Sequence, residues 1–144
     1  MKRIALLFLP LFFSVNALCQ TQFFDGTVSE LQSTAINENR SYIIEFTTEW
    51  CQPCKKMDRD VFNDKEVYDY LSESYLIIKV DAESEAYKGL AMQKLIDAYP
   101  SFVVMNAKGE EQGRLVGYYS KYSFLKHLKD FKHKTPNTRY TEFR

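Results

Sequence analysis

Cysteine is scarce in this chain, and neither sign of charge is in excess. Only 3 of the 144 residues are cysteines, too few for the disulfide framework that supports small secreted domains. The 19 basic residues are balanced by 19 acidic ones, which argues against a nucleic acid as partner. Internal repeats and low-complexity linkers are lacking as well. With 45% hydrophobic residues, the chain can build a single domain around its own core.

The N-terminus has the pattern of a secretory signal peptide. A basic pair at positions 2 and 3 precedes an apolar run from Ile4 to Val15. That run is too short to span a bilayer comfortably, so the pattern favours a cleaved signal over a retained anchor. Ala17 and Cys19 suit the small residues that precede such a cleavage site, and the mature chain would then begin at Gln20.

Cys19 permits a second interpretation of the same segment. A lipoprotein would carry lipid on Cys19 after cleavage behind Leu18, a bulky residue where such sites normally have a small one. In either case we expect a protein that is exported to the periplasm or beyond the cell. The predicted division is a signal peptide at 1–19, a domain at 20–131 and a polar, basic tail at 132–144.

Helix and strand patterns alternate along the remaining chain. A capping box formed by Thr27 and Glu30 begins the first helix, and later helices are expected after Pro53, after Asn63, over 87–98 and after Ser120. Strands are expected at 42–47, 75–80, 102–105 and 114–118, where apolar and β-branched residues gather. The residues of the first helix that are expected to face the core are Val28, Leu31, Ala35 and Ile36. Those of the helix over 87–98 are Tyr87, Ala91, Leu95 and Ala98.

This order of elements predicts the fold class. Strands that alternate with helices, followed by a strand pair and a last helix, give an α/β fold. We expect a mixed central sheet of about four to five strands, flanked by helices on both faces.

The motif Cys51-Gln52-Pro53-Cys54 stands between an expected strand and an expected helix. Two cysteines at this spacing can close a small disulfide and reopen it, and the position is typical of a thioredoxin-like redox site. The start of a helix lowers the pKa of a thiol, and the thiolate is the reactive species. The motif therefore predicts thiol–disulfide chemistry.

From about Val28 to Phe131 the chain resembles the thioredoxin superfamily. Within it, the chain is most similar to secreted thioredoxin-like proteins and to the C-terminal periplasmic domain of DsbD-type reductant transporters. The matching pieces are Glu-Trp-Cys-Gln-Pro-Cys-Lys at 49–55, Tyr-Pro-Ser-Phe at 99–102, Lys-Gly at 108–109 and Val-Gly-Tyr at 116–118. The resemblance implies a thioredoxin-like fold.

The resemblance also assigns roles to the two cysteines. Cys51 is expected to be the exposed nucleophile and Cys54 the more buried resolving thiol. An inert disulfide is one alternative, although so small a loop stabilises little. Half of a zinc site is another, with His127 and His133 as further ligands, although structural zinc normally takes four. We expect no metal and no cofactor besides the Cys51–Cys54 disulfide.

Three further residues are expected to bind the substrate. Pro100 matches the cis-proline of the family, whose loop faces the CxxC motif and pairs with the substrate backbone; a plain trans proline that stops a helix is the alternative. Trp50 is expected to offer a flat surface to partner peptides, or else to pack in the core. Tyr99 is expected to shape the groove. Gly117 is expected to allow close backbone approach near this loop, or else to be a simple glycine at the end of a strand.

Glu45 lies six residues before Cys51, where related proteins carry a buried aspartate. A buried carboxyl group has a raised pKa and could take the proton of Cys54 during the reaction. A solvated or salt-bridged glutamate is the alternative. Pro53 removes a backbone N–H near the sulfurs, which favours a reducing couple, whereas Gln52 departs from the Gly-Pro of thioredoxins and leaves the potential open.

The sequence thus predicts an exported thiol–disulfide oxidoreductase that reduces protein disulfides. Its partners would be protein thiols and disulfides, together with a membrane-bound reductant donor, and we expect a monomer. An oxidase or isomerase of the same fold is a rival, although the chain has no room for the large helical insertion of DsbA-type oxidases. A non-catalytic peptide-binding or chaperone module is the rival from another class.

Overall fold

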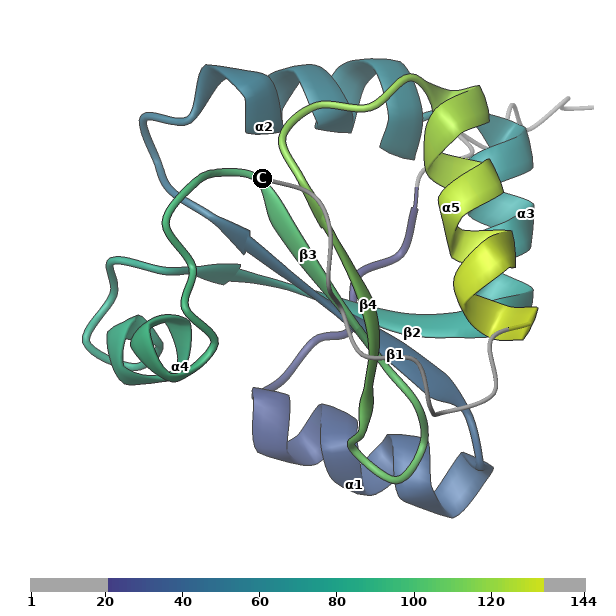
Figure 1. Ribbon diagram of the computed structural model, residues 1–144, viewed down its shortest axis with the longest axis horizontal. Helices are drawn as coiled ribbons and strands as arrows, with labels where there is room; N and C mark the ends of the chain where they lie inside the picture. Colours follow the sequence, from purple (N-terminus) through teal and green to yellow (C-terminus); the bar gives the residue numbers. More distant parts are fainter. Residues whose placement is uncertain (1–20, 134–144) are drawn as a thin grey trace, which may run out of the picture.

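The computed structural model describes residues 21–133 (Figure 1). The predictions for the signal peptide, for Cys19 and for the tail from residue 134 onward lie outside the described residues. The elements in chain order are α1 (Val28–Glu38), β1 (Ser41–Thr47), α2 (Gln52–Met57), η1 (Asp58–Phe62), α3 (Lys65–Ser74), β2 (Tyr75–Asp81), α4 (Lys88–Gln93), β3 (Ser101–Met105), β4 (Glu111–Val116) and α5 (Lys121–His133).

The four strands form one mixed sheet in the order β2-β1-β3-β4. β1 pairs in parallel with β2 and antiparallel with β3, and β3 pairs antiparallel with β4. A parallel pair needs a crossover connection, which α2, η1 and α3 supply. The predicted mixed sheet is confirmed.

Helices cover both faces of this sheet, as predicted. α1 and α4 lie on one side, and α2, α3 and α5 lie on the other (Figure 1). Successive side chains of a strand point to opposite faces. Ile43 of β1 therefore packs into the cluster with Met57 and Phe124, whereas Ile44 packs into the cluster with Leu31. Glu45 follows the alternation toward the α2 side.

The first helix begins as predicted but buries a narrower stripe. Both hydrogen bonds of the Thr27–Glu30 capping box are present. Val28, Leu31 and Ala35 are buried, but Ile36 is 63% exposed. Each residue advances about 100° around a helix, which turns Ile36 away from the face that Ala35 buries.

The start of α3 also differs from the prediction. Asp64, not Asn63, is its N-cap, and the Asp64 side chain accepts a hydrogen bond from the Glu66 N–H. Asn63 instead ends η1. Asn63 still has helical backbone angles (φ −88°, ψ 0°), whereas Asp64 is extended (φ −84°, ψ 133°), as is typical of an N-cap residue.

α4 is much shorter than the predicted helix over 87–98. It ends at Gln93, and Leu95 adopts φ 54° and is 80% exposed. The Leu95 N–H donates to the Met92 carbonyl at 3.0 Å, and the Ile96 N–H donates to the Ala91 carbonyl at 2.9 Å. These two bonds form a Schellman motif, which closes the helix and turns Leu95 outward.

The last two elements are shifted along the sequence. β4 spans Glu111–Val116 instead of 114–118, because Gly117 has φ +88° and leaves the extended conformation. α5 continues to His133, past the predicted end of the domain, and Lys132 donates to the Ser74 hydroxyl at 3.1 Å.

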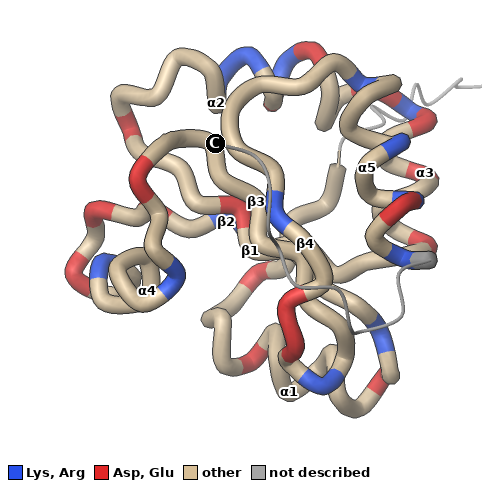
Figure 2. The backbone as a smooth tube through the Cα atoms, viewed as in Figure 1, with Lys and Arg blue, Asp and Glu red and all other residues tan. Residues whose placement is uncertain are grey.

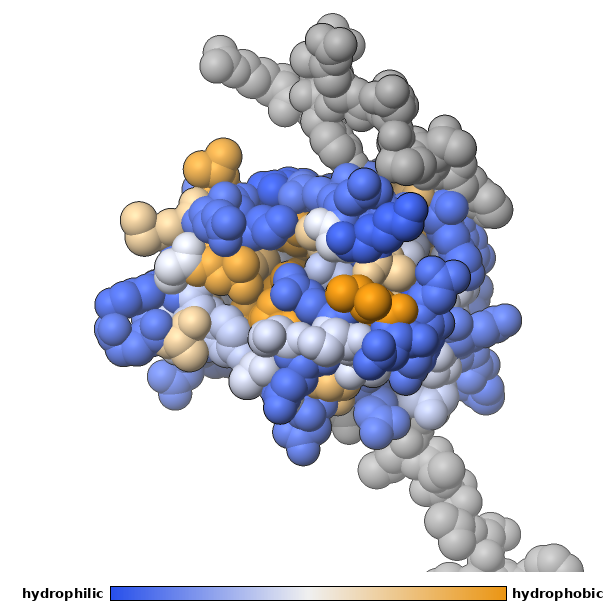
Figure 3. All heavy atoms as spheres, turned by 90° about the horizontal axis from the view of Figure 1, so that it is seen from below, coloured by the Kyte–Doolittle hydropathy of each residue, from blue (hydrophilic) through white to orange (hydrophobic). Residues whose placement is uncertain are grey.

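The surface of the described domain carries mixed charge and small hydrophobic groups. Lys and Arg alternate with Asp and Glu along the α2–η1 segment, whereas the charges of α5 are mostly lysines (Figure 2). Viewed from below, hydrophobic residues form small groups among hydrophilic ones (Figure 3). Within residues 21–133, every helix falls short of the length and apolar character needed to cross a membrane.

Candidate active site

Cys51 and Cys54 are joined by a disulfide at the start of α2. Cys51 is the N-cap of this helix, and its sulfur accepts a hydrogen bond from the Cys54 N–H at 3.1 Å. Pro53 fits the first helical turn because its missing N–H would have no partner there. Gln52 and Pro53 are exposed, so the motif faces solvent through these two residues.

The prediction that Cys51 is exposed is wrong for the disulfide form. Cys51 is 1% exposed and Cys54 is 2% exposed. The disulfide holds the Cys51 sulfur against the first turn of α2, with a Cα–Cα distance of 5.3 Å. The two cysteines therefore do not differ in exposure while they are oxidised.

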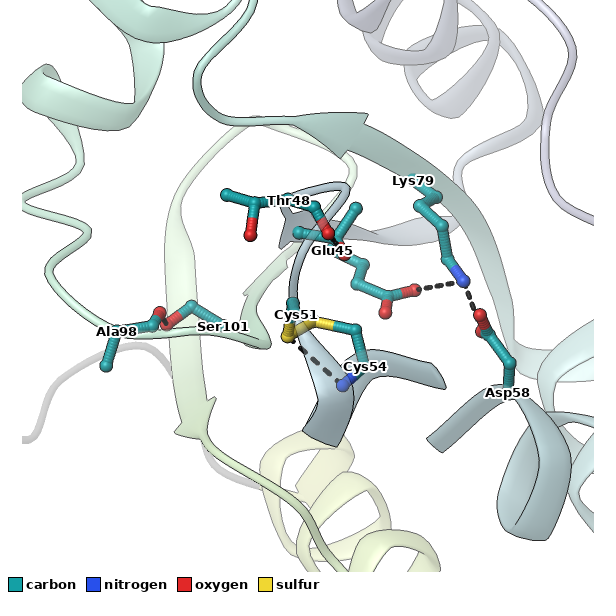
Figure 4. The surroundings of a disulfide bond; sticks show 9 residues. Glu45, Thr48, Cys51, Cys54, Asp58, Lys79, Ala98 and Ser101 are labelled. Carbon is teal, nitrogen blue, oxygen red and sulfur yellow. Dashed lines mark hydrogen bonds and ion pairs between the residues drawn. A yellow bond between two sulfur atoms is a disulfide. The ribbon is translucent and has the colours of Figure 1, made fainter. Parts of the chain in front are cut away.

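The Pro100 loop lies beside the disulfide, as predicted. The Tyr99–Pro100 peptide bond is cis, which rules out the trans alternative. Ser101, the first residue of β3, donates its hydroxyl to the Ala98 carbonyl at 2.7 Å. The chain between these two residues passes near the cysteine pair (Figure 4). The Pro100 carbonyl accepts the Gly117 N–H at 2.7 Å.

The backbone of Gly117 approaches the Pro100 loop closely, as predicted, but this approach is not what requires a glycine. A Cβ atom at this position would meet nothing within 4 Å. Its φ of +88°, however, lies in the region that L-residues other than glycine avoid. The predicted reason for this glycine is therefore corrected.

Trp50 lies on the surface, so the core-packing alternative is wrong. Trp50 is 61% exposed. The indole Nε1–H donates to Glu83 Oε2 at 3.0 Å, and the ring meets Tyr99 edge-to-face at 5.8 Å between centroids. Partial burial raises the pKa of Tyr99. Trp50, Tyr99 and Glu83 thus form a surface of packed and hydrogen-bonded side chains next to the motif, the Trp50–Tyr99 wall.

Glu45 is completely buried on the α2 side of the sheet. Figure 4 shows its carboxyl group between the cysteine pair and Lys79. The Lys79 Nζ lies 3.6 Å from Glu45 Oε2, and neither carboxyl oxygen has a hydrogen-bond partner among the described residues. Burial raises the pKa of Glu45 to about 8; the Lys79 charge opposes this effect and the Asp58 charge adds to it.

Two residues of this site were missed by the sequence prediction. Lys79 of β2 pairs with Glu45 in the parallel register, and Asp58 of η1 forms an ion pair with Lys79. One signal was available, since Glu45 and Lys79 each interrupt an apolar strand. Asp58 has no such signal, because it lies among other charged residues of the α2–η1 segment and its partner Lys79 lies on β2.

The described residues contain no group of three or more His, Cys, Asp and Glu residues that could hold a metal ion. The ring of His127 lies between Tyr119 and Phe131, with centroids at 5.5 Å and 6.5 Å. Cys51 and Cys54 are bonded to each other. The chemistry of the site therefore centres on sulfur and on the Glu45 carboxyl group.

Comparison with known proteins agrees with this geometry. The family model of the thioredoxin-like domain matches residues 28–132. The thiol:disulfide interchange protein DsbD of Vibrio cholerae is 28% identical over 110 residues, which cover 72% of this chain and 18% of that protein. Protein disulfide-isomerase 5-2 of Arabidopsis thaliana is 31% identical over 69% of this chain and 23% of its own length. The chain thus spans about a fifth of these relatives.

Solved structures match over most of the described domain. A candidate disulphide-isomerase from Bacteroides thetaiotaomicron has a TM-score of 0.72 and 28% identity, over 81% of this chain and 96% of that chain. The C-terminal domain of DsbD from Neisseria meningitidis, in its oxidised form, has a TM-score of 0.61 and 19% identity, over 76% of this chain and 98% of its own. The latter likeness concerns the fold alone.

Proposed function

This chain belongs to the thioredoxin-like domain family, and we propose that it is a thiol–disulfide oxidoreductase that reduces protein disulfides outside the cytoplasm. The observation that carries the proposal is the Cys51–Cys54 disulfide at the start of α2, beside the cis Pro100 loop. Pro53 supports the reducing direction, because it removes one N–H donor near the sulfurs and so disfavours the thiolate form. The similarity to DsbD also supports it.

The reaction begins with the reduced pair. The Cys51 thiolate attacks one sulfur of the partner disulfide, so that a Cys51–partner disulfide forms and one partner thiolate leaves and takes a proton. Cys54 then loses its proton and attacks the Cys51 sulfur. The Cys51–Cys54 disulfide forms, the second partner thiolate leaves, and two electrons have passed to the partner.

Glu45 is the proposed proton acceptor for Cys54. Its buried position beside the cysteine pair (Figure 4) and its pKa of about 8 support this role. A base is most effective when its pKa lies near the working pH, and a thiol has an ordinary pKa of about 8.5. The proton transfer from Cys54 to Glu45 is then nearly balanced in energy.

Trp50, Tyr99 and Pro100 are the proposed substrate-binding residues. The Pro100 loop pairs with the backbone of the partner in the manner of an added strand, and the Trp50–Tyr99 wall contacts its side chains. The partners are proteins with unwanted disulfides. A membrane-bound thiol reductant returns electrons to the Cys51–Cys54 pair, which needs no further cofactor, and the chain works as a monomer.

Trapping the covalent intermediate tests this proposal. A Cys54→Ser variant, incubated with insulin, should accumulate a mixed disulfide through Cys51, because the resolving thiol is missing. The matched Cys51→Ser variant should form none, and the reduced wild-type protein should release free insulin chains. If the two variants trapped insulin equally, or if the wild type released none, the assigned roles would be wrong.

Disulfide isomerisation is a second candidate function. It is favoured by the similarity to the Arabidopsis disulfide-isomerase. An isomerase restores activity to a protein with scrambled disulfides without net electron transfer, whereas a reductase leaves free thiols. Counting thiols in scrambled ribonuclease after incubation separates the two functions.

A further inference from the structure

Lys79 lies between two carboxyl groups, one buried and one at the surface. Its Nζ is 3.6 Å from Glu45 Oε2, and it donates a hydrogen bond to Asp58 Oδ1. Figure 4 shows both interactions converging on the same ammonium group. Lys79 is therefore hydrogen-bonded to Asp58, while its contact with Glu45 is only an ion pair.

The two carboxyl groups differ sharply in their environment. Asp58 has a side chain that is 44% exposed, whereas that of Glu45 is 0% exposed. Both oxygens of Glu45 lack a hydrogen bond within the described part of the chain. A buried carboxylate without hydrogen bonds is costly, so an ammonium group this close would normally turn toward it.

The surroundings of Lys79 explain why it does not. Asp58 is the first residue of η1, and its backbone N–H donates to the Cys54 and Lys55 carbonyls. The end of α2 therefore positions the carboxylate that pairs with Lys79. The Lys79 Nζ also lies over the ring faces of Phe23 and Phe62, 4.6 Å and 5.5 Å from their centroids. These contacts hold the ammonium group on the side of Asp58.

We propose that Asp58 is a positioning residue for the redox reaction. It holds the Lys79 ammonium group and thereby keeps Glu45 basic enough to accept the proton of the Cys54 thiol. The role of Asp58 in the redox reaction rests on the proposed function. Its effect on the ionisation of Glu45 does not.

Few other charges face Glu45. Phe102, its neighbour on β3, is apolar, and Lys79 is its neighbour on β2. From the α2 side come the cysteine pair and Asp58. The Lys79 and Asp58 charges act on the pKa of Glu45 in opposite directions, so their removal should move it in opposite directions.

The direct test is an NMR titration of the Glu45 side-chain carboxyl carbon in the oxidised protein, where neither cysteine titrates. Asp58→Asn should lower the titration midpoint by about one pH unit, because a like charge is lost and Lys79 is free to pair with Glu45. Lys79→Gln should raise it. Asp58→Glu, which keeps the charge, should return the midpoint toward that of the wild type.

Asp60→Asn is the matched control. Asp60 also belongs to η1, but it pairs with Lys56 and Arg59 and not with Lys79. Its removal should leave the midpoint of Glu45 unchanged. A midpoint in Asp58→Asn that stays at the wild-type value, or rises, would overturn the proposal.

The catalytic consequence has its own readout. The rate of the Cys54 step can be followed in a single turnover, started by mixing the reduced protein, with both cysteines intact, with a partner disulfide. This rate should rise with pH as Glu45 ionises. In Asp58→Asn the rise should occur at lower pH, with a plateau at least several-fold lower. An unshifted profile would overturn the positioning role. If the wild type fails to complete the step at all, the proposed function fails, while the NMR titration still decides the electrostatic part.

Discussion

Glu45 places an ionisable group inside the core of the domain. Its pKa rises from an ordinary value of 4.5 to about 8 in the folded protein, mainly through burial. Between these values the folded state binds more protons than the unfolded state, so stability must fall as the pH rises. The residue proposed to serve catalysis therefore destabilises the fold in the pH range where it becomes charged.

Unfolding experiments can measure this cost. Between pH 5 and pH 8 the oxidised wild-type protein should lose roughly 3 kcal/mol of unfolding free energy through Glu45. Glu45→Gln cannot ionise and should lose much less, whereas Glu49→Gln, at an exposed position, should behave like the wild type. Urea unfolding at the two pH values provides the comparison. Equal losses in all three proteins would contradict the buried, raised-pKa carboxyl group.

Trp50 should matter for partners and not for folding. It is 61% exposed, and exposed positions usually change stability by less than about 0.5 kcal/mol. Buried at an interface, however, a tryptophan often contributes 2 kcal/mol or more, so Trp50→Ala should slow the reduction of a protein disulfide by about tenfold or more. Stopped-flow kinetics can measure the rate. Tyr122→Ala, at a 77% exposed aromatic residue on α5, is the control and should leave it unchanged.

At the scale of elements, the loop from β4 to α5 is joined to the Pro100 loop by a single backbone hydrogen bond. Gly117 donates to the Pro100 carbonyl at 2.7 Å, and it can do so because it adopts φ +88°. The cis-proline loop is thus supported from the neighbouring strand end. The conformation of one glycine contributes to the geometry of the site.

Gly117→Ala should destabilise the protein by about 1–2 kcal/mol, because a Cβ atom is disfavoured in left-handed backbone. The matched variant is Gly89→Ala. Gly89 lies in α4 with nothing near its Cβ position, and alanine is the better helix former by about 1 kcal/mol. Thermal unfolding should therefore show opposite shifts, and a neutral Gly117→Ala would refute the conformational requirement.

α5 packs closely against β4 at Gly113. A Cβ atom at this position would collide with the ring of Phe131, a residue that is only 7% exposed. Gly113→Ala should therefore displace α5 and lower the free energy of unfolding by about 1–3 kcal/mol, which is the usual effect of overpacking a core. Chemical denaturation can compare it with Gly89→Ala, whose opposite sign separates crowding from any general effect of added methyl groups. An unchanged denaturation midpoint would show that α5 adjusts freely.

At the scale of the whole molecule, features encoded by local sequence were predicted well, and features set by long-range contacts were not. The capping box at Thr27 and the first three strands follow from short patterns, and the cis form of Pro100 is implied by the family resemblance. The outward turn of Leu95 depends on a Schellman motif that contains no glycine, and the burial of Cys51 depends on its disulfide. The Lys79–Asp58 pair joins β2 to the end of α2, and a contact between segments this far apart in the chain has no signature in the sequence.

The central claim is that Cys51 and Cys54 form a reducing couple. It is tested most directly by equilibrating the domain with defined ratios of thiol to disulfide and measuring the oxidised fraction of the pair. The account predicts a reduction potential near the value of about −270 mV that is known for thioredoxin. A potential near about −120 mV, as in strongly oxidising proteins of this fold, would contradict the reductase and make the protein an oxidase.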